Sequence, residues 1–122
     1  MKAVRAIILL GAGLALGACD GDERTTRIAG DGDGARGREA ITRYGCGACH
    51  EIPGVPGARG IVGPSLRGLG TRPYLAGHLP NDPGNLVAWI RRPRALDPKT
   101  IMPDLAVSER DAQDIAAFLI QR

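Results

Sequence analysis

Five consecutive residues, Cys46-Gly47-Ala48-Cys49-His50, carry the most distinctive chemistry in this chain. Two thiols three residues apart can add across the two vinyl groups on one edge of a haem, and the histidine that follows can place an imidazole nitrogen on the iron. This C-x-x-C-H pattern is the attachment motif of c-type haem. Gly47 and Ala48 are small, so the backbone between the thiols can lie close to a flat ring. The motif therefore predicts one covalently bound haem c, attached through Cys46 and Cys49, with His50 as an axial iron ligand.

Other chemistries of cysteine fit the same residues less well. An iron–sulfur cluster or a structural zinc needs about four ligands, and the chain has only three cysteines, one of them the distant Cys19. The neighbours Cys49 and His50 cannot easily bind one metal tetrahedrally. A thioredoxin-like dithiol would belong to a βαβ unit, which the sequence does not contain. An odd number of cysteines also excludes a fully paired disulfide framework.

The second axial ligand of the iron has two candidates, His78 and Met102. Met102 lies in a proline-bounded loop between predicted helices, and the usual role of a methionine is to fill a core. His78 lies in a loop as well, where a lone histidine is more often solvated than bound to a metal. The residue types alone leave this choice open.

The N-terminal residues have the pattern of an export signal. Residues 1–5 are short and basic, and residues 6–18 carry no charge over a length that is too short to span a bilayer but suits a secretory signal. Residues 16–19 (LGAC) resemble the bacterial lipobox, whose cysteine is acylated and becomes the mature N-terminus. An ordinary signal peptide with an incidental cysteine and an uncleaved anchor are the alternatives. We expect residues 1–18 to be removed and lipidated Cys19 to hold the protein on the periplasmic side of a membrane in the bacterial cell envelope.

Composition separates a linker from a domain. Residues 20–36 contain five acidic residues, four glycines and one large apolar residue, Ile28, so we expect residues 19–36 to form a flexible tether. Residues 37–122 are expected to form one compact domain. The signal contains two of the 16 basic residues, which leaves 14 against 13 acidic ones. This excess is too small to argue for nucleic-acid binding, and we expect no nucleic-acid partner.

The domain has the pattern of a small all-α fold. Residues 37–45 favour a helix, and the glycine- and proline-rich residues 51–70 favour a loop. A short helix is expected near Thr71, carrying Tyr74 and Leu75, and no segment predicts a strand. The chain has only four aromatic residues against 18 glycines and 9 prolines, so its own side chains form a thin core. We therefore expect three to five helices that wrap around the haem and do not fold stably without it.

Two later helices have clear start signals. Asp82 is placed to cap a helix with Pro83 in its first position, and Pro93 is expected to end that helix. Ser108 is placed to cap the last helix, with Asp111 in the capping-box position. The apolar faces of these helices are formed by Leu86, Trp89 and Ile90, and by Ala112, Ile115, Ala116, Phe118 and Leu119.

From residue 37 to the C-terminus the chain resembles a class I cytochrome c. In that family an N-terminal helix leads into C-x-x-C-H, a Gly-Pro pair follows, and a late Met-Pro pair supplies the second axial ligand. Gly63-Pro64 and Met102-Pro103 match these pairs. The resemblance implies that Met102, rather than His78, binds the iron, and that the Pro64 carbonyl orients the ring of His50.

The same resemblance implies further contacts. Gly37 and Phe118 match a close crossing of the first and last helices. Trp89 is expected to pack on the haem, with plain core filling as the alternative. Arg72 is expected to contact a haem propionate, with a solvated arginine as the equal alternative. The haem pocket implied in this way comprises Pro64, Leu66, Arg72, Tyr74, Trp89 and Ile90.

A narrower resemblance is to the cytochrome c domain fused to subunit II of some bacterial haem-copper oxidases. The shared positions are Gly63-Pro64, Leu66, Leu79-Pro80-Asn81, Asn85-Leu86, Ala88-Trp89-Ile90, Pro93, Pro98 and Met102-Pro103. Ser65 departs from the pattern, because an acidic residue is common there. No copper-binding domain or membrane hairpin precedes these positions in the sequence. The resemblance therefore implies a related module that a lipid, rather than an oxidase subunit, tethers to the membrane.

The expected function is electron transfer without catalysis. An iron with histidine and methionine ligands has both axial positions filled, so no substrate can bind. We expect a monohaem carrier that donates electrons to a terminal oxidase. The alternatives are an electron-transfer subunit of a periplasmic dehydrogenase, and a ligand-binding or peroxidase-type haem protein with an open iron site. The expected partners are redox proteins and the membrane, with no small-molecule substrate.

A basic run follows the predicted helix that starts at Pro83. Arg91, Arg92 and Arg94 could dock an acidic partner protein and accelerate its encounter with this one. A solvated helix face is the simpler interpretation.

Overall fold

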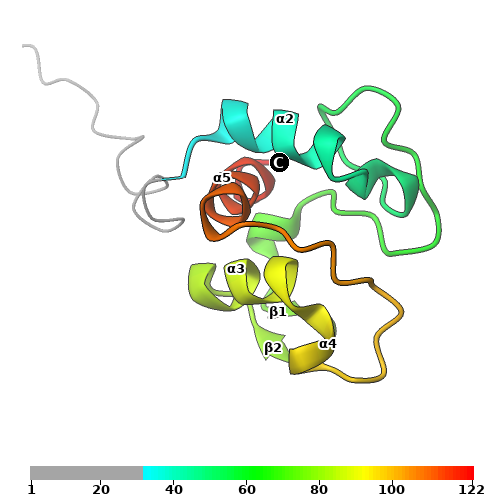
Figure 1. Ribbon diagram of the computed structural model, residues 1–122, viewed down its shortest axis with the longest axis vertical. Coiled ribbons are helices and arrows are strands. Elements are labelled where there is room, and N and C mark those ends of the chain that lie inside the picture. The colour runs from blue at the N-terminus through cyan, green and yellow to red at the C-terminus, as the bar shows by residue number, and fades with distance from the viewer. Residues whose placement is uncertain (1–31) are drawn as a thin grey trace, which may run out of the picture.

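The computed structural model describes residues 32–122 of the 122-residue chain (Figure 1). The expected signal peptide, Cys19 and most of the tether lie outside the described residues. In chain order the elements are helix α2 (Gly34–Arg43), 3₁₀ turns η1 (Cys46–Ala48) and η2 (Leu69–Thr71), strands β1 (Tyr74–Leu75) and β2 (Leu79–Pro80), and helices α3 (Pro83–Arg91), α4 (Pro93–Leu96) and α5 (Glu109–Ile120). No helix within residues 32–122 is long and apolar enough to cross a membrane.

Helices α2 and α5 cross in close contact and form the base of the core. In Figure 1 they lie together above α3, α4 and the β1–β2 hairpin. Gly37 makes the crossing possible, because a Cβ at this position would overlap the carbonyl oxygen of Asp114. Ala40 and Ile41 on α2 are fully buried, as is most of the expected apolar face of α5. The close helix crossing expected at Gly37 is present, and Phe118 lies beside Gly34, one turn along α5.

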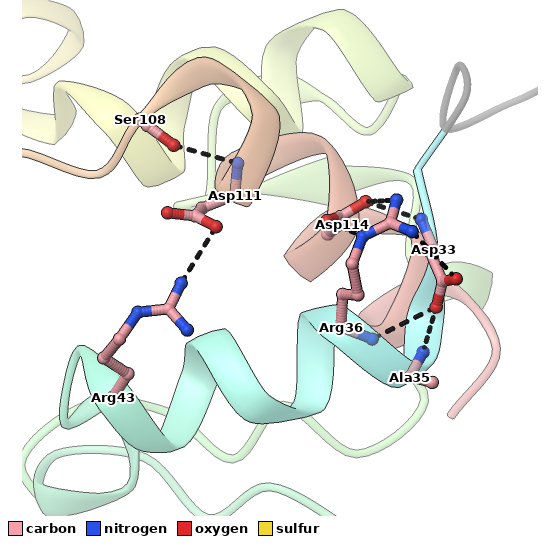
Figure 2. A network of polar contacts seen from close by, with 7 residues as sticks. All are labelled: Asp33, Ala35, Arg36, Arg43, Ser108, Asp111 and Asp114. Atoms are coloured by element: carbon pink, nitrogen blue, oxygen red, sulfur yellow. Dashed lines mark hydrogen bonds and ion pairs between the residues drawn. The ribbon is translucent and has the colours of Figure 1, made fainter.

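The start of α2 differs from the sequence expectation. The helix begins at Gly34 rather than at residue 37, because the Asp33 side chain accepts hydrogen bonds from the backbone N–H groups of Ala35 and Arg36. Arg36 in turn donates two hydrogen bonds to the carboxylate of Asp114 on α5, at 2.8 and 3.0 Å (Figure 2). The last residues assigned to the tether therefore belong to the folded domain, where a distant carboxylate anchors them.

The segment after η2 also differs from expectation. Tyr74 and Leu75 form strand β1, which pairs antiparallel with β2, so both the short helix expected there and the absence of strands are wrong. Pro73 disfavours a helical conformation at Arg72, whose ψ is 141°. The chain then turns back through Ala76 and Gly77, whose φ angles are 49° and 80°. Because of these local constraints, the segment forms a tight hairpin rather than the expected helix.

The two predicted helix starts are confirmed. The Asp82 side chain accepts a hydrogen bond from the backbone N–H of Asn85 at 2.8 Å, and Pro83 occupies the first position of α3. Ser108 caps α5 by accepting from the backbone N–H of Asp111 at 3.1 Å. Helix α3 ends before Pro93, as expected, but Pro93 then begins the one-turn helix α4.

Candidate cofactor-binding site

One apolar cavity of about 230 Å³ lies between the helix crossing, α3, the hairpin and the loops. Residues from nearly every part of the described chain line it, from Ile41 on α2 to Leu119 on α5. All the site residues predicted within residues 32–122 are among them. They are Cys46, Cys49, His50, Pro64, Leu66, Arg72, Tyr74, Trp89, Ile90 and Met102.

His50 is held from two sides. Its Nδ1 lies 2.7 Å from the carbonyl oxygen of Pro64, the contact that the family resemblance implies. Because that carbonyl can only accept, Nδ1 donates and Nε2 carries the free lone pair that a metal needs. Gly63 lies in close contact with the imidazole, since a Cβ there would lie 2.7 Å from Nδ1. The ring orientation and the tautomer are therefore set by the Gly63-Pro64 pair.

Cys46 and Cys49 lie at the turn η1 and are free, half-buried thiols. Gly45 starts the turn with a φ of 72°, and Gly47 lies so close to Ala58 that a Cβ on it would meet the Ala58 Cα at 2.8 Å. Burial raises the pKa of the Cys46 thiol, so it is neutral at pH 7. A neutral thiol is a poor nucleophile, so Cys46 is not activated for thiol exchange.

The fold separates the two candidates for the second axial ligand. Met102 lines the same cavity as His50 and is half-buried, and its loop is shaped by a hydrogen bond from the Met102 backbone N–H to Thr100 Oγ1 at 3.2 Å. His78 is exposed and does not line the cavity. Its Nδ1 lies 3.0 Å from the carbonyl oxygen of Ala76, within its own hairpin. Met102 is thus the candidate that shares a cavity with His50.

Backbone carbonyls hold two polar side chains, Arg72 in the cavity wall and Asn81 outside it. Arg72 donates from Nη2 to the carbonyl oxygens of Ser65 and Arg67, at 2.7 and 2.8 Å, so it braces the loop that carries Pro64. Asn81 donates to the carbonyl oxygens of Leu69 and Arg72, at 2.7 and 2.8 Å. The sequence analysis did not predict this role of Asn81. An amide side chain just before a capped helix can indicate it, because the preceding loop has carbonyl groups that need donors.

Several apolar residues that line the cavity were not predicted as site residues. Some are buried core residues, and others are exposed at the mouth, where Val62 is 62% and Ile101 75% exposed. The buried members are Ile52, Leu69, Leu75, Val107 and Ile115. Within residues 32–122, no group of three or more histidine, cysteine, aspartate or glutamate side chains is arranged to hold a metal ion. The arrangement suits a large flat apolar group reached by two thiols, one imidazole and one thioether.

Comparison with known proteins gives one informative relation. No family model matches the chain. Over 85 residues, which cover 69% of this chain, it is 35% identical to cytochrome c oxidase subunit 2 of Alkalihalophilus pseudofirmus. The match spans 24% of that relative's length. The chain is therefore related to a part of subunit II of the haem-copper oxidases.

Proposed function

From the relation to part of an oxidase subunit II, we propose that this protein is a respiratory electron carrier that holds one haem c in its cavity. Cys46 and Cys49 would form the two thioethers, and His50 and Met102 would supply the iron ligands. One observation carries the proposal. Residues predicted from separate segments of the sequence, spanning residues 46 to 102, all line one apolar cavity.

The donor set fits an axially ligated haem iron. Pro64 engages Nδ1 of His50, which leaves Nε2 as the ligating atom, and Met102 offers a soft sulfur from the same cavity. When bound, the haem would supply reversible one-electron chemistry at its iron. The side chains of this chain would orient the axial ring, exclude water and keep the surroundings apolar, which favours the less charged ferrous iron. Because this chain would itself supply the nitrogen and sulfur ligands of the iron, we propose a carrier rather than an enzyme.

The proposed setting is the respiratory membrane. The relation to a cytochrome c oxidase subunit 2 supports a respiratory complex as the partner, and donation of electrons to a terminal oxidase is the specific form that we propose. Attachment through a lipid on Cys19 is part of the same proposal, based on the lipobox-like residues 16–19. The exposed apolar residues at the cavity mouth, such as Val62 and Ile101, would let a partner approach that edge closely.

The test is the optical spectrum and intact mass of the full chain, produced in a bacterium that matures c-type cytochromes. We expect the mass of one haem that survives denaturation, together with an acyl mass on Cys19. We also expect a weak far-red band from sulfur-to-iron coordination in the oxidised protein. Met102→Ala should abolish this band, whereas His78→Ala, the matched control outside the cavity, should leave it unchanged.

Two results would contradict the proposal. One is the absence of covalent haem on the wild-type chain. The other is a far-red band that persists in Met102→Ala, or ready binding of carbon monoxide by the reduced wild-type protein, because either would require a different ligand or an open iron site.

A further inference from the structure

A second concave surface lies on the other face of α3. It is a groove of about 380 Å³ between α3 and α5 that shares no residue with the cavity. Val87 and Ala88 contribute its apolar floor, and Arg91 and Arg92 contribute its positive charge. Helix α3 thus presents Leu86, Trp89 and Ile90 to the cavity and a different set of residues to the groove. A ligand in the groove would leave the cavity mouth open.

Arg91 is incompletely paired in this groove. Its Nη1 donates to Glu109 Oε2 across a long contact of 3.3 Å. Its Nε is buried, and it has no hydrogen-bond partner among the described residues. Arg92 is exposed beside it. The partly exposed guanidinium of Arg91 beside that of Arg92 favours a negatively charged occupant.

The chain itself enters the domain at one end of this groove. Gly32 is the first described residue, and its backbone lies so close to Gln113 that a Cβ on it would overlap the Gln113 carbonyl oxygen. Gln113 lines the groove, and so does Glu109, one turn earlier on α5. The N–H of Asp33 donates to the Asp114 carboxylate at 2.6 Å, which fixes this entry point (Figure 2). The residues that precede Gly32 therefore start next to the groove.

The composition of those preceding residues complements the groove. Residues 20–31 (DGDERTTRIAGD) contain four acidic and two basic residues, and residues 20–23 contain three acidic residues and no basic one. Ile28 is the only large apolar side chain in this stretch. Ile28 lies four Cα-to-Cα steps before Gly32, a reach of up to about 14 Å, whereas one turn of α5 spans about 5.4 Å. Ile28 can thus reach the apolar floor, and the acidic residues can reach the two guanidinium groups.

We propose that residues 22–28 dock in this groove, with Ile28 on Val87 and Ala88 and the carboxylates of Asp22 and Glu23 on Arg91 and Arg92. The inference does not depend on the haem. Its consequence depends on the lipid proposed at Cys19. Docking would leave only residues 20 and 21 between the anchor and the groove, so it would hold the groove face toward the bilayer and shorten the reach of the domain.

Hydrogen–deuterium exchange of the full chain in detergent micelles tests this proposal. We expect amides within residues 23–30 to exchange about fivefold or more slowly than an unstructured chain. Arg91→Glu with Arg92→Glu should remove this protection, and so should Ile28→Asp, a change outside the folded domain that cannot unfold it. Arg94→Glu is the matched control, because Arg94 belongs to the same basic run but does not line the groove. Asp22→Arg with Glu23→Arg should restore protection in the double glutamate variant.

Several outcomes would overturn the proposal. Unprotected amides in the wild type would exclude docking, and protection that survives Arg91→Glu with Arg92→Glu would exclude this groove. A third outcome would assign the groove to an acidic partner protein instead. In it, Arg91→Glu with Arg92→Glu lowers the electron-transfer rate while the exchange of residues 20–31 stays unchanged. The hydrogen-exchange readouts do not need the haem, so the proposal can fail independently of the proposed function.

Discussion

At the scale of single residues, the orientation of the His50 imidazole depends on two neighbours whose side chains carry no reactive group. Pro64 supplies a carbonyl 2.7 Å from Nδ1. Gly63 has no side chain, and this is required because ring atoms of His50 occupy the space that a Cβ would need. A histidine ligand is useful only when the lone pair of one nitrogen is free and correctly aimed, and these two residues provide both conditions.

We predict that Gly63→Ala displaces the ring of His50. The added methyl group would meet the imidazole in a packed site, so we expect a loss of about 1–3 kcal/mol in the free energy of unfolding. A weaker far-red band should accompany it if the haem is bound as proposed. Denaturant unfolding followed by circular dichroism measures the loss. Gly84→Ala is the control, because a Cβ there meets only a side-chain oxygen at 3.3 Å, and an unchanged Gly63→Ala stability would contradict the packing argument.

At the scale of elements, polar groups hold α2 against α5 at both ends of their crossing. Arg36 and the Asp33 backbone share the carboxylate of Asp114, which is almost fully buried (Figure 2). At the other end, Tyr44 donates to Asp111 at 2.7 Å, and Arg43 donates to the same carboxylate at 2.9 Å. The Tyr44 end leads directly into the C-x-x-C-H segment. The two helices therefore fix the positions of the Cys46 and Cys49 thiols and of His50.

We predict that the Asp114 contact makes stability fall in acid. The hydrogen-bonded Arg36 guanidinium holds the pKa of Asp114 below its ordinary value. A lowered folded-state pKa means that the contribution is fully present above the unfolded value of about 3.9 and is lost as the pH falls through the folded value. Asp114→Asn should therefore cost about 1–3 kcal/mol at pH 7, and this difference should shrink below about pH 4.

Urea unfolding of both proteins at pH 7, 5 and 3 measures the effect of Asp114→Asn. Glu39→Gln, an exposed position on α2, is the control and should change stability by less than about 0.5 kcal/mol at any of these values. A cost of Asp114→Asn that is constant from pH 7 to pH 3 would show that the charge of Asp114 does not stabilise the crossing.

At the scale of the whole molecule, the cavity is the part of the core that the side chains leave unfilled. Its walls come from residues between Ile41 and Leu119, so it is the shared centre of the domain. A dry, empty cavity of 230 Å³ would cost about 5 kcal/mol at roughly 24 cal/mol per Å³. That is as large as the entire stability of a marginal domain, about 5 kcal/mol. We therefore expect the domain to be stable only when an apolar group fills this cavity.

We predict that the full chain with Cys46→Ser and Cys49→Ser, which cannot attach haem covalently, loses its cooperative thermal unfolding transition. The matched control is Cys19→Ser, which leaves the C-x-x-C-H motif intact and should unfold cooperatively. Far-ultraviolet circular dichroism during heating distinguishes them. A cooperative transition of similar midpoint in both proteins would mean that the domain does not need its proposed occupant.

The sequence by itself determined the features whose causes are local. The spacing of Cys46, Cys49 and His50 predicts haem attachment from five residues alone. The helix starts at Asp82 and Ser108 follow from hydrogen bonds that reach three residues along the chain. The tertiary structure decided the features whose causes lie far away in sequence. The start of α2 combines both kinds of cause, because Asp33 caps it locally and Asp114, about eighty residues later, holds Asp33 and Arg36 in place. Strands of two residues are too short for any periodicity to indicate, so the hairpin also required the fold.

The same distinction separates the two candidate ligands. The sequence predicted similar loops for His78 and Met102. Only the fold shows that Met102 lines the cavity that His50 also lines, and that His78 is exposed. Local hydrogen bonds are set by the chemistry of neighbouring residues, whereas the meeting of distant residues depends on how the helices pack, which no short segment of sequence contains.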